Sequence, residues 1–166
     1  MKQGLLDWTI TIGLVLVVIS IIGLFDNGPN IPAEAPHFIV NDINGHTVDL
    51  QQLRGQTVVI NFWATWCGSC IKEIPDFSRF AKEHPDIPVI GLAVDSGTRN
   101  DVSRFANQHD MTYTVAIADP STVDDYDIGA FPTTIIVDPA GQVQAVNVGA
   151  MSHRQLSKLT QSRSPR

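Results

Sequence analysis

The sequence predicts an α/β domain in which a mixed β-sheet is flanked by helices. Continuous apolar runs rich in β-branched residues, typical of buried strands, alternate with segments whose apolar residues recur at helical spacing. Near the C-terminus, two strand-like segments surround the turn sequence Asp138-Pro139-Ala140-Gly141, which indicates a closing hairpin. Strands that alternate with helices and end in a hairpin form a mixed sheet covered by helices, and 166 residues suit one such domain.

The first part of the chain is predicted to be a membrane anchor. Residues 8–25 contain no charged side chain, and as a helix they would span about 27 Å, close to the thickness of the hydrocarbon core of a bilayer. A buried core helix is less favoured because so uniformly apolar a helix is unusual in a small domain. A cleaved signal peptide is also less favoured, since the small-x-small site, Ala33-Glu34-Ala35, lies well beyond the apolar segment.

The charges around the apolar segment predict its orientation. Lys2 and the terminal amine precede it, and Asp26 follows it. The positive-inside rule then places residues 1–7 in the cytoplasm and the rest of the chain outside it. Residues 26–36, rich in proline, are expected to form an extended linker to a domain over residues 37–166. We therefore expect a single-pass protein of the cell inner membrane whose domain faces the periplasm or the cell exterior.

Within the domain, a hairpin, core strands and helices are predicted in a regular order. Asn44-Gly45 is a strong turn signal between the strands His37–Val40 and His46–Leu50, and Gln51–Gly55 forms a short turn. The expected core and closing strands are Thr57–Trp63, Val89–Val94, Tyr113–Ala118, Thr133–Val137 and Gln142–Val148. The expected helices are Cys67–His84, Asp101–His109, Val123–Ile128 and Ser152–Thr160, the last with Ser152 as its N-cap.

The overall composition excludes several classes of protein. The chain has 17 acidic and 11 basic residues and a formal net charge of −6, which argues against a nucleic-acid-binding surface. Its 2 cysteines cannot build a scaffold of several disulfides or supply a four-thiolate zinc site. The 5 histidines are scattered along the sequence away from the cysteines, so no metal site is predicted.

The two cysteines form the candidate catalytic motif, Cys67-Gly68-Ser69-Cys70, which follows a predicted buried strand and opens a predicted helix. At that position, unpaired N–H groups and the positive end of the helix dipole stabilise a thiolate. We therefore expect Cys67 to have a lowered pKa and to be the attacking sulfur. Cys70 lies one turn further along and can resolve a mixed disulfide. The strand–turn–helix context disfavours two alternatives, a static disulfide and half of a metal site.

Glu73, one helical turn after Cys70, is the candidate acid. A partly buried carboxyl group has a raised pKa and could exchange protons with Cys70. The alternative is an exposed glutamate that only interacts favourably with the helix dipole.

These residues resemble the thioredoxin superfamily over about residues 37–160. Four parts of the sequence are similar to the family's strand and active-site signature, helix proline, cis-proline loop and late glycine: Asn61–Cys70, Pro75, Phe131-Pro132-Thr133-Thr134 and Gly149. The N-terminal apolar segment, the early hairpin and an extra strand–helix unit resemble the membrane-anchored TlpA/ResA-type branch.

The resemblance implies a thioredoxin-like fold with a redox-active Cys67–Cys70 disulfide. It also implies a cis bond before Pro132 and a loop beside the cysteines, in which the backbone of Phe131 pairs with the substrate. The residues then expected to contact substrate are Trp66, Gly68, Ser69, Phe131 and Pro132. In the reductase branch an acid at the position of Glu73 has the proposed proton-exchange role, whereas Asn61 stands where thioredoxins proper carry a buried aspartate.

The predicted function is that of a membrane-anchored, extracytoplasmic thiol–disulfide oxidoreductase that reduces protein disulfides. No nicotinamide or flavin fingerprint is present in the sequence, so no cofactor is expected and the electrons would come from a membrane partner protein. By resemblance, the substrate is an oxidised protein dithiol, such as an apocytochrome c in cytochrome c-type biogenesis.

Three other functions stay open. A protein disulfide oxidase would donate its disulfide, but the histidine that strongly oxidising relatives carry between the cysteines is missing. A copper-binding chaperone on the same fold would bind Cu(I) through the two soft thiolates, although that group generally has wider cysteine spacing and a late histidine. A thiol peroxidase would carry a threonine two residues further from its cysteine than Thr65 is from Cys67.

Overall fold

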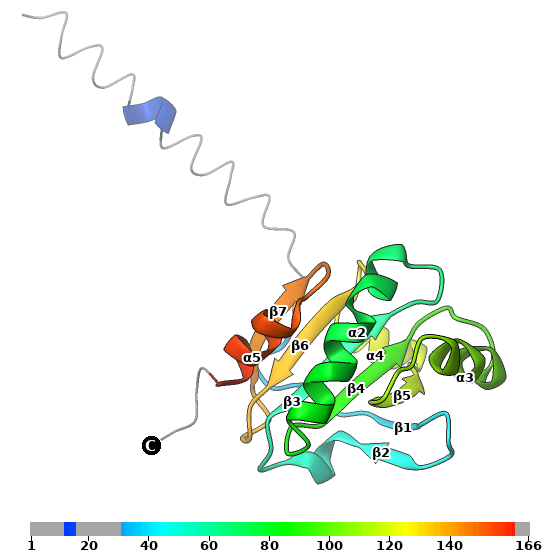
Figure 1. Ribbon diagram of the computed structural model, residues 1–166. Coiled ribbons are helices and arrows are strands. Elements are labelled where there is room, and N and C mark those ends of the chain that lie inside the picture. The colour runs from blue at the N-terminus through cyan, green and yellow to red at the C-terminus, as the bar shows by residue number, and fades with distance from the viewer. Residues whose placement is uncertain (1–11, 16–30, 162–166) are drawn as a thin grey trace, which may run out of the picture.

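The computed structural model describes residues 12–15 and 31–161, and the latter form an α/β domain of the predicted kind (Figure 1). Residues 12–15 are helical. In these two ranges, no helix is long and apolar enough to cross a bilayer. The rest of the predicted anchor, residues 1–7, residues 26–30 of the predicted linker and residues 162–166 lie outside the described residues.

A five-stranded mixed sheet forms the centre of the domain, in the order β5-β4-β3-β6-β7. Its strands are β3 (Val58–Trp63), β4 (Val89–Ala93), β5 (Thr114–Ile117), β6 (Thr133–Val137) and β7 (Val143–Val148). The pairs β3–β4 and β4–β5 are parallel, whereas β3–β6 and β6–β7 are antiparallel. All residues of β3, β4 and β6 are buried, which explains why their sequences are continuous apolar runs and not alternating ones.

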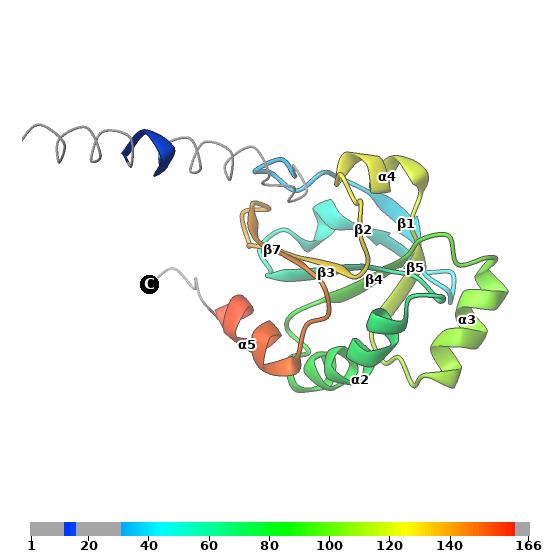
Figure 2. The same cartoon turned by 90° about the horizontal axis from the view of Figure 1, so that it is seen from above.

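Helices cover one face of the sheet, and a helix with a hairpin covers the other (Figure 2). The first face carries α2, α3 and α5, which span Gly68–Glu83, Arg99–Gln108 and His153–Gln161. The second carries α4 and the hairpin of β1 and β2, which span Pro120–Asp125, Ile39–Asn41 and Thr47–Asp49. Alternate residues of β3 pack into the apolar cores on opposite faces of the sheet. Val59 packs with Phe77 of α2 on one face, whereas Phe62 packs with Tyr126 on the other. Asn61 therefore faces α2.

The helix α4 differs from its prediction, because it spans Pro120–Asp125 and not Val123–Ile128. Proline is favoured in the first turn of a helix, where its missing N–H has no helical partner to lose, so Pro120 begins the helix directly after Asp119. The turn predicted over Gln51–Gly55 is largely a 3-10 helix, Leu50–Leu53, capped by Asp49. The other predicted strands and helices of the domain are present, with ends that differ by a few residues.

Part of the predicted linker pairs with the closing hairpin. The N–H of Ala35 donates to the carbonyl of Gly141 at 3.0 Å, and the N–H of Val143 donates to the carbonyl of Ala33 at 2.7 Å. Ala35 is buried as a result. Residues 31–36 therefore pack on the domain, and we call them the N-terminal strap.

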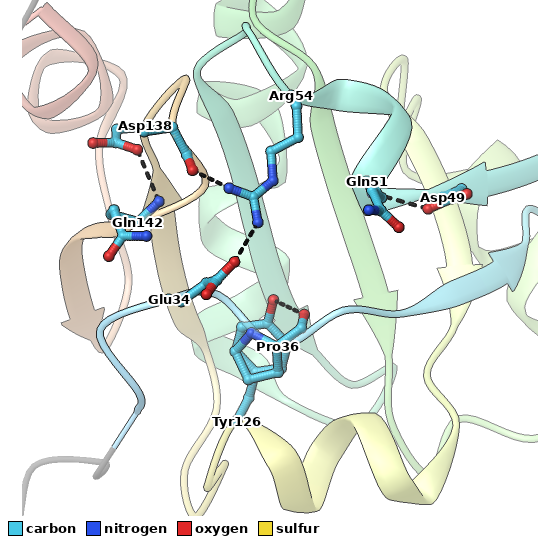
Figure 3. Close-up of polar contacts among 9 residues, drawn as sticks. Glu34, Pro36, Asp49, Gln51, Arg54, Tyr126, Asp138 and Gln142 are labelled. Atoms are coloured by element: carbon cyan, nitrogen blue, oxygen red, sulfur yellow. Dashed lines mark hydrogen bonds and ion pairs between the residues drawn. The ribbon is translucent and has the colours of Figure 1, made fainter.

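Two side chains of the domain form hydrogen bonds with the strap (Figure 3). The guanidinium group of Arg54 donates to the carboxylate of Glu34 at 2.6 Å and also to the carbonyl of Ala140. The hydroxyl of Tyr126, which follows α4, donates to the carbonyl of Pro36 at 2.7 Å. The strap is thus held on one side by Arg54, the residue after η1 (Leu50–Leu53), and on the other side by Tyr126, the residue after α4.

Candidate active site

The cysteine pair lies where α2 begins. Cys67 is the N-cap of this helix, and its Sγ accepts the N–H of Cys70 at 3.2 Å. The two cysteines form a disulfide with their Cα atoms 5.3 Å apart. Cys67 is 7% exposed and Cys70 is 1% exposed, so an incoming sulfur meets Cys67 first. The geometry thus fits the predicted order, in which Cys67 attacks and Cys70 resolves.

The loop before Cys67 is held to the end of the neighbouring strand. The hydroxyl of Ser96 accepts the N–H of Thr65 at 3.0 Å and donates to the carbonyl of Val94 at 2.8 Å. The N–H of Cys67 donates to the carbonyl of Ala64 at 3.1 Å. Sequence reasoning missed Ser96, because a lone serine after a strand has no distinguishing pattern.

Aromatic side chains line the exposed side of the cysteine pair. Trp66 is 63% exposed, its Nε1–H donates to the carbonyl of Asp95 at 3.1 Å, and its ring meets that of Phe131 edge-on, with centroids 5.7 Å apart. Phe131 in turn packs against the apolar cluster that contains both cysteines. Gly68 and Ser69 are exposed between them. The structure therefore brings together the residues that the resemblance assigned to substrate contact.

The loop that contains Pro132 is anchored from both ends of the closing hairpin. The Phe131–Pro132 peptide bond is cis, as the resemblance implied. The hydroxyl of Thr133 donates to the carbonyl of Ala130 at 2.9 Å, and the N–H of Gly149 donates to the carbonyl of Pro132 at 2.8 Å. Gly149 has a φ of +102°, which side chains with a Cβ rarely adopt. The late glycine noted in the sequence thus connects the end of β7 to this loop.

The carboxyl group of Glu73, one helical turn after Cys70, is buried and hydrogen-bonded through both oxygens. Glu73 is 3% exposed. Its Oε1 accepts Nδ2–H of Asn61 at 2.9 Å, and its Oε2 accepts the N–H of Met151 at 2.8 Å. Burial raises the pKa of Glu73 to about 7, although these two hydrogen bonds oppose the rise and the charge of Asp76 adds to it. Burial rules out the alternative of an exposed glutamate at the helix start.

Two further residues complete this polar cluster, and sequence reasoning missed both. Thr134 is opposite Asn61 in the β3–β6 register, and its Oγ1 accepts Nδ2–H of Asn61 at 3.1 Å. Thr134 could have been found as a polar residue next to an apolar strand segment. Met151 leaves no signal in the sequence because its backbone N–H makes the contact. We call Asn61, Glu73, Thr134 and the Met151 N–H the Glu73 cluster.

In the described part of the chain, no group of three or more histidine, cysteine, aspartate or glutamate side chains could hold a metal ion. His153 forms an ion pair with Glu83 at 2.7 Å, and His37 and His46 contact Asp49 and Asp42.

Comparison with known proteins agrees with this site. The AhpC/TSA family model matches residues 31–146. Thioredoxin-like protein YneN of Bacillus subtilis is 32% identical over 128 residues, which cover 75% of each chain. Thiol-disulfide oxidoreductase ResA of Bacillus cereus is 34% identical over 135 residues, which cover 80% of this chain and 78% of that protein.

A solved structure also superposes closely. The crystal structure of a thiol:disulfide interchange protein of the thioredoxin family from Chlorobium tepidum has a TM-score of 0.71 and 26% sequence identity, and the match covers 80% of this chain and 97% of that one. The family match over residues 31–146 includes the cysteine motif. The chain belongs to the AhpC/TSA family and is a thiol–disulfide oxidoreductase with a thioredoxin-like fold.

Proposed function

We propose that this protein is a membrane-anchored, extracytoplasmic reductase of protein disulfides. The observation that carries the proposal is the arrangement of three groups on the first turns of α2: the more accessible sulfur of Cys67, the buried sulfur of Cys70, and the buried carboxyl group of Glu73. The apolar segment over residues 8–25 and the charges around it support the anchor and its orientation. The ResA relatives support the chemical class.

The reaction proceeds by two thiol–disulfide exchanges. The Cys67 thiolate attacks a client disulfide, one client sulfur leaves as a thiolate, and a mixed disulfide forms. Cys70 then passes its proton to the Glu73 carboxylate and attacks Sγ of Cys67, which releases the second client thiolate. The client gains two electrons and the protein retains the Cys67–Cys70 disulfide. A dithiol protein in the membrane reduces this disulfide again by the reverse exchanges.

The client is an oxidised protein dithiol, such as an apocytochrome c before haem attachment. It reaches Cys67 over the exposed ring of Trp66, with Gly68 and Ser69 leaving the approach open. An extended client segment pairs with the backbone of Phe131 beside Pro132, which adds a strand-like contact. The edge-on packing of Trp66 and Phe131 gives this surface an apolar character suited to an unfolded client.

Trapping in cells tests this function. In the full chain, Cys70→Ser leaves the mixed disulfide without its resolving thiol, so we expect client proteins and the membrane electron donor to stay linked to Cys67. Non-reducing electrophoresis followed by mass spectrometry identifies them. The double variant C67S/C70S is the matched control and should capture neither. Recovery of a quinone-linked oxidase in place of clients and donor would instead support the disulfide oxidase and overturn the reductase.

A further inference from the structure

Asn61 is a polar residue in the middle of the most buried strand of the sheet. It is 2% exposed and faces α2 from β3, between the apolar residues Val59 and Trp63 on the same face. A buried amide is costly unless its polar atoms are hydrogen-bonded. Its position therefore requires partners, and those partners are the functional carboxyl group and a neighbouring hydroxyl.

The hydrogen bonds of the Asn61 amide suit the ionised form of Glu73. Its Nδ2 group donates to Oε1 of Glu73 at 2.9 Å and to Oγ1 of Thr134 at 3.1 Å. The second carboxylate oxygen, Oε2, accepts the backbone N–H of Met151 at 2.8 Å. Two donors aimed at an acceptor-only group suit the charged carboxylate.

The proposed reaction also requires the neutral form. When Glu73 holds the proton of Cys70, its carboxyl group carries an O–H donor that needs an acceptor. The N–H of Met151 is fixed in the backbone and can only donate. The side-chain amide of Asn61 can supply either a donor or an acceptor. Rotating it by about 180° puts its carbonyl oxygen in the place of its NH₂ group with little change in shape. The hydroxyl of Thr134 can follow, since it donates as readily as it accepts.

We propose that Asn61 is a positioning residue for the proton step: its amide holds the Glu73 carboxyl group and turns as that group gains or loses its proton. This inference rests on the proposed proton exchange between Glu73 and Cys70. An aspartate at this position would bring no NH₂ group, would donate to the Glu73 carboxylate only when protonated, and would itself titrate.

The groups around Glu73 leave this amide as the main adjustable partner. On its own helix, Glu73 is affected by the charge of Asp76 and lies one turn from Cys70. From the β5 side, the phenol of Tyr113 is close enough for the charge of Glu73 to raise its pKa, in addition to the effect of burial. The facing groups of β3, β6 and the turn before α5 are neutral: the amide of Asn61, the hydroxyl of Thr134 and the N–H of Met151.

Two substitutions at position 61 test the proposal. Asn61→Leu replaces the amide by an apolar side chain of similar size, and we expect it to raise the pKa of Glu73 by about one unit or more, because a donor to the carboxylate is lost. Asn61→Asp keeps the shape but replaces the donor by a second acid, and we expect a larger rise with two coupled titration steps. Ser78→Ala is the matched control: it removes a buried hydrogen bond from α2 to Asp110 outside the Glu73 cluster.

Three readouts are measured on the full-length protein and its variants, the NMR readouts in the oxidised form and the kinetics in the reduced form. Carbon NMR of the carboxyl group gives the pKa of Glu73, and single-turnover kinetics give the pH profile of mixed-disulfide resolution after reduction. In the wild type, the side-chain amide signals of Asn61 should change with the same midpoint as the Glu73 carboxyl signal. Ser78→Ala should lower the melting temperature and leave both the pKa of Glu73 and the pH profile unchanged.

The outcomes separate this inference from the function on which it rests. A folded Asn61→Asp or Asn61→Leu variant with an unchanged Glu73 pKa, or Asn61 amide signals that ignore the titration of Glu73, would overturn the positioning role. If Asn61→Leu does not fold, the isosteric Asn61→Asp decides. If Glu73→Gln resolves the mixed disulfide with the wild-type pH profile while the Asn61 variants still shift the pKa of Glu73, the coupling of the Asn61 amide to the titration of Glu73 stands, but the proton exchange with Cys70 fails and with it the part of Asn61 in that step.

Discussion

The Glu73 cluster and the N-terminal strap are both built from hydrogen bonds between distant segments, and they differ above all in exposure. Glu73, Asn61 and Thr134 are buried, whereas the side chains of Arg54 and Glu34 are 41% and 65% exposed. In the first region, burial raises the pKa of an acid to the range where thiols exchange protons. In the second, solvent screens an ion pair of good geometry. Burial, and not the number of polar contacts, distinguishes the reactive region from the structural one.

The largest effect on stability is expected from Glu73→Gln, and it depends on pH. The native carboxyl group has a pKa of about 7 against an ordinary value of 4.5, so between these values the native state binds a proton that the unfolded state has released. The stability linked to this proton is fully present below pH 4.5 and is lost as the pH rises through 7. Over that interval the loss is at most about 3 kcal/mol.

Urea unfolding of the oxidised wild type and Glu73→Gln across this pH range measures the difference. Other acids with shifted pKa values, such as Asp42 and Asp101, are present in both proteins and cancel in the comparison. The wild type should lose stability relative to the variant as the pH rises. Two parallel stability curves would mean that Glu73 does not titrate in this range.

A smaller effect is expected from Tyr126→Phe, which removes one hydrogen bond to the strap. The ring is fully buried and stays in place, while the carbonyl of Pro36 loses its donor. We expect the free energy of unfolding to fall by about 1 kcal/mol, with no pH dependence near neutrality. The rate of disulfide reduction should not change, because the hydroxyl lies outside the active site. A slower reaction in the folded variant would show that the strap and the active site are coupled.

The smallest effect is expected from Arg54→Ala, which removes the exposed pair with Glu34 and the exposed hydrogen bond to the carbonyl of Ala140. Exposed ion pairs contribute less than about 1 kcal/mol and are weakened by salt. Thermal unfolding at low and high salt should therefore show a small difference from wild type that shrinks further at high salt. Glu34→Gln, which keeps the shape of the partner, is the control for the charge. A loss as large as that in Glu73→Gln would remove the contrast between the two regions.

Local patterns in the sequence are sufficient to predict the core of the fold. The apolar run of β3 predicts a buried strand, and the Asn44-Gly45 turn signal predicts a hairpin. Both predictions succeed because strand burial and hairpin geometry depend on nearby residues. For the same reason, the sequence around the cysteine motif predicts correctly that the motif lies at the start of α2. The position of Glu73 one turn behind the motif left both a buried and an exposed carboxyl group possible, and only the structure shows that it is buried.

The remaining features depend on contacts that the sequence pattern does not record. The strap has the composition of a linker, yet residues 33–35 pair with the closing hairpin through backbone groups, which every residue type carries. Met151 likewise serves Glu73 through its N–H. The start of α4 was predictable from Pro120, but the helix was predicted to begin later, at Val123. Side-chain patterns predict elements well and backbone-mediated contacts poorly.

The short turn between β7 and α5 carries two separate connections to the active site. Gly149 donates to the carbonyl of Pro132, and Met151 donates to the carboxylate of Glu73. In the proposed mechanism, these two contacts link the loop that receives a client to the carboxyl group that receives the proton of Cys70. An inserted or deleted residue in this turn is therefore expected to displace the Pro132 loop relative to the carboxyl group of Glu73. The turn also constrains its own residues, because Gly149 has a positive φ and Met151 is buried.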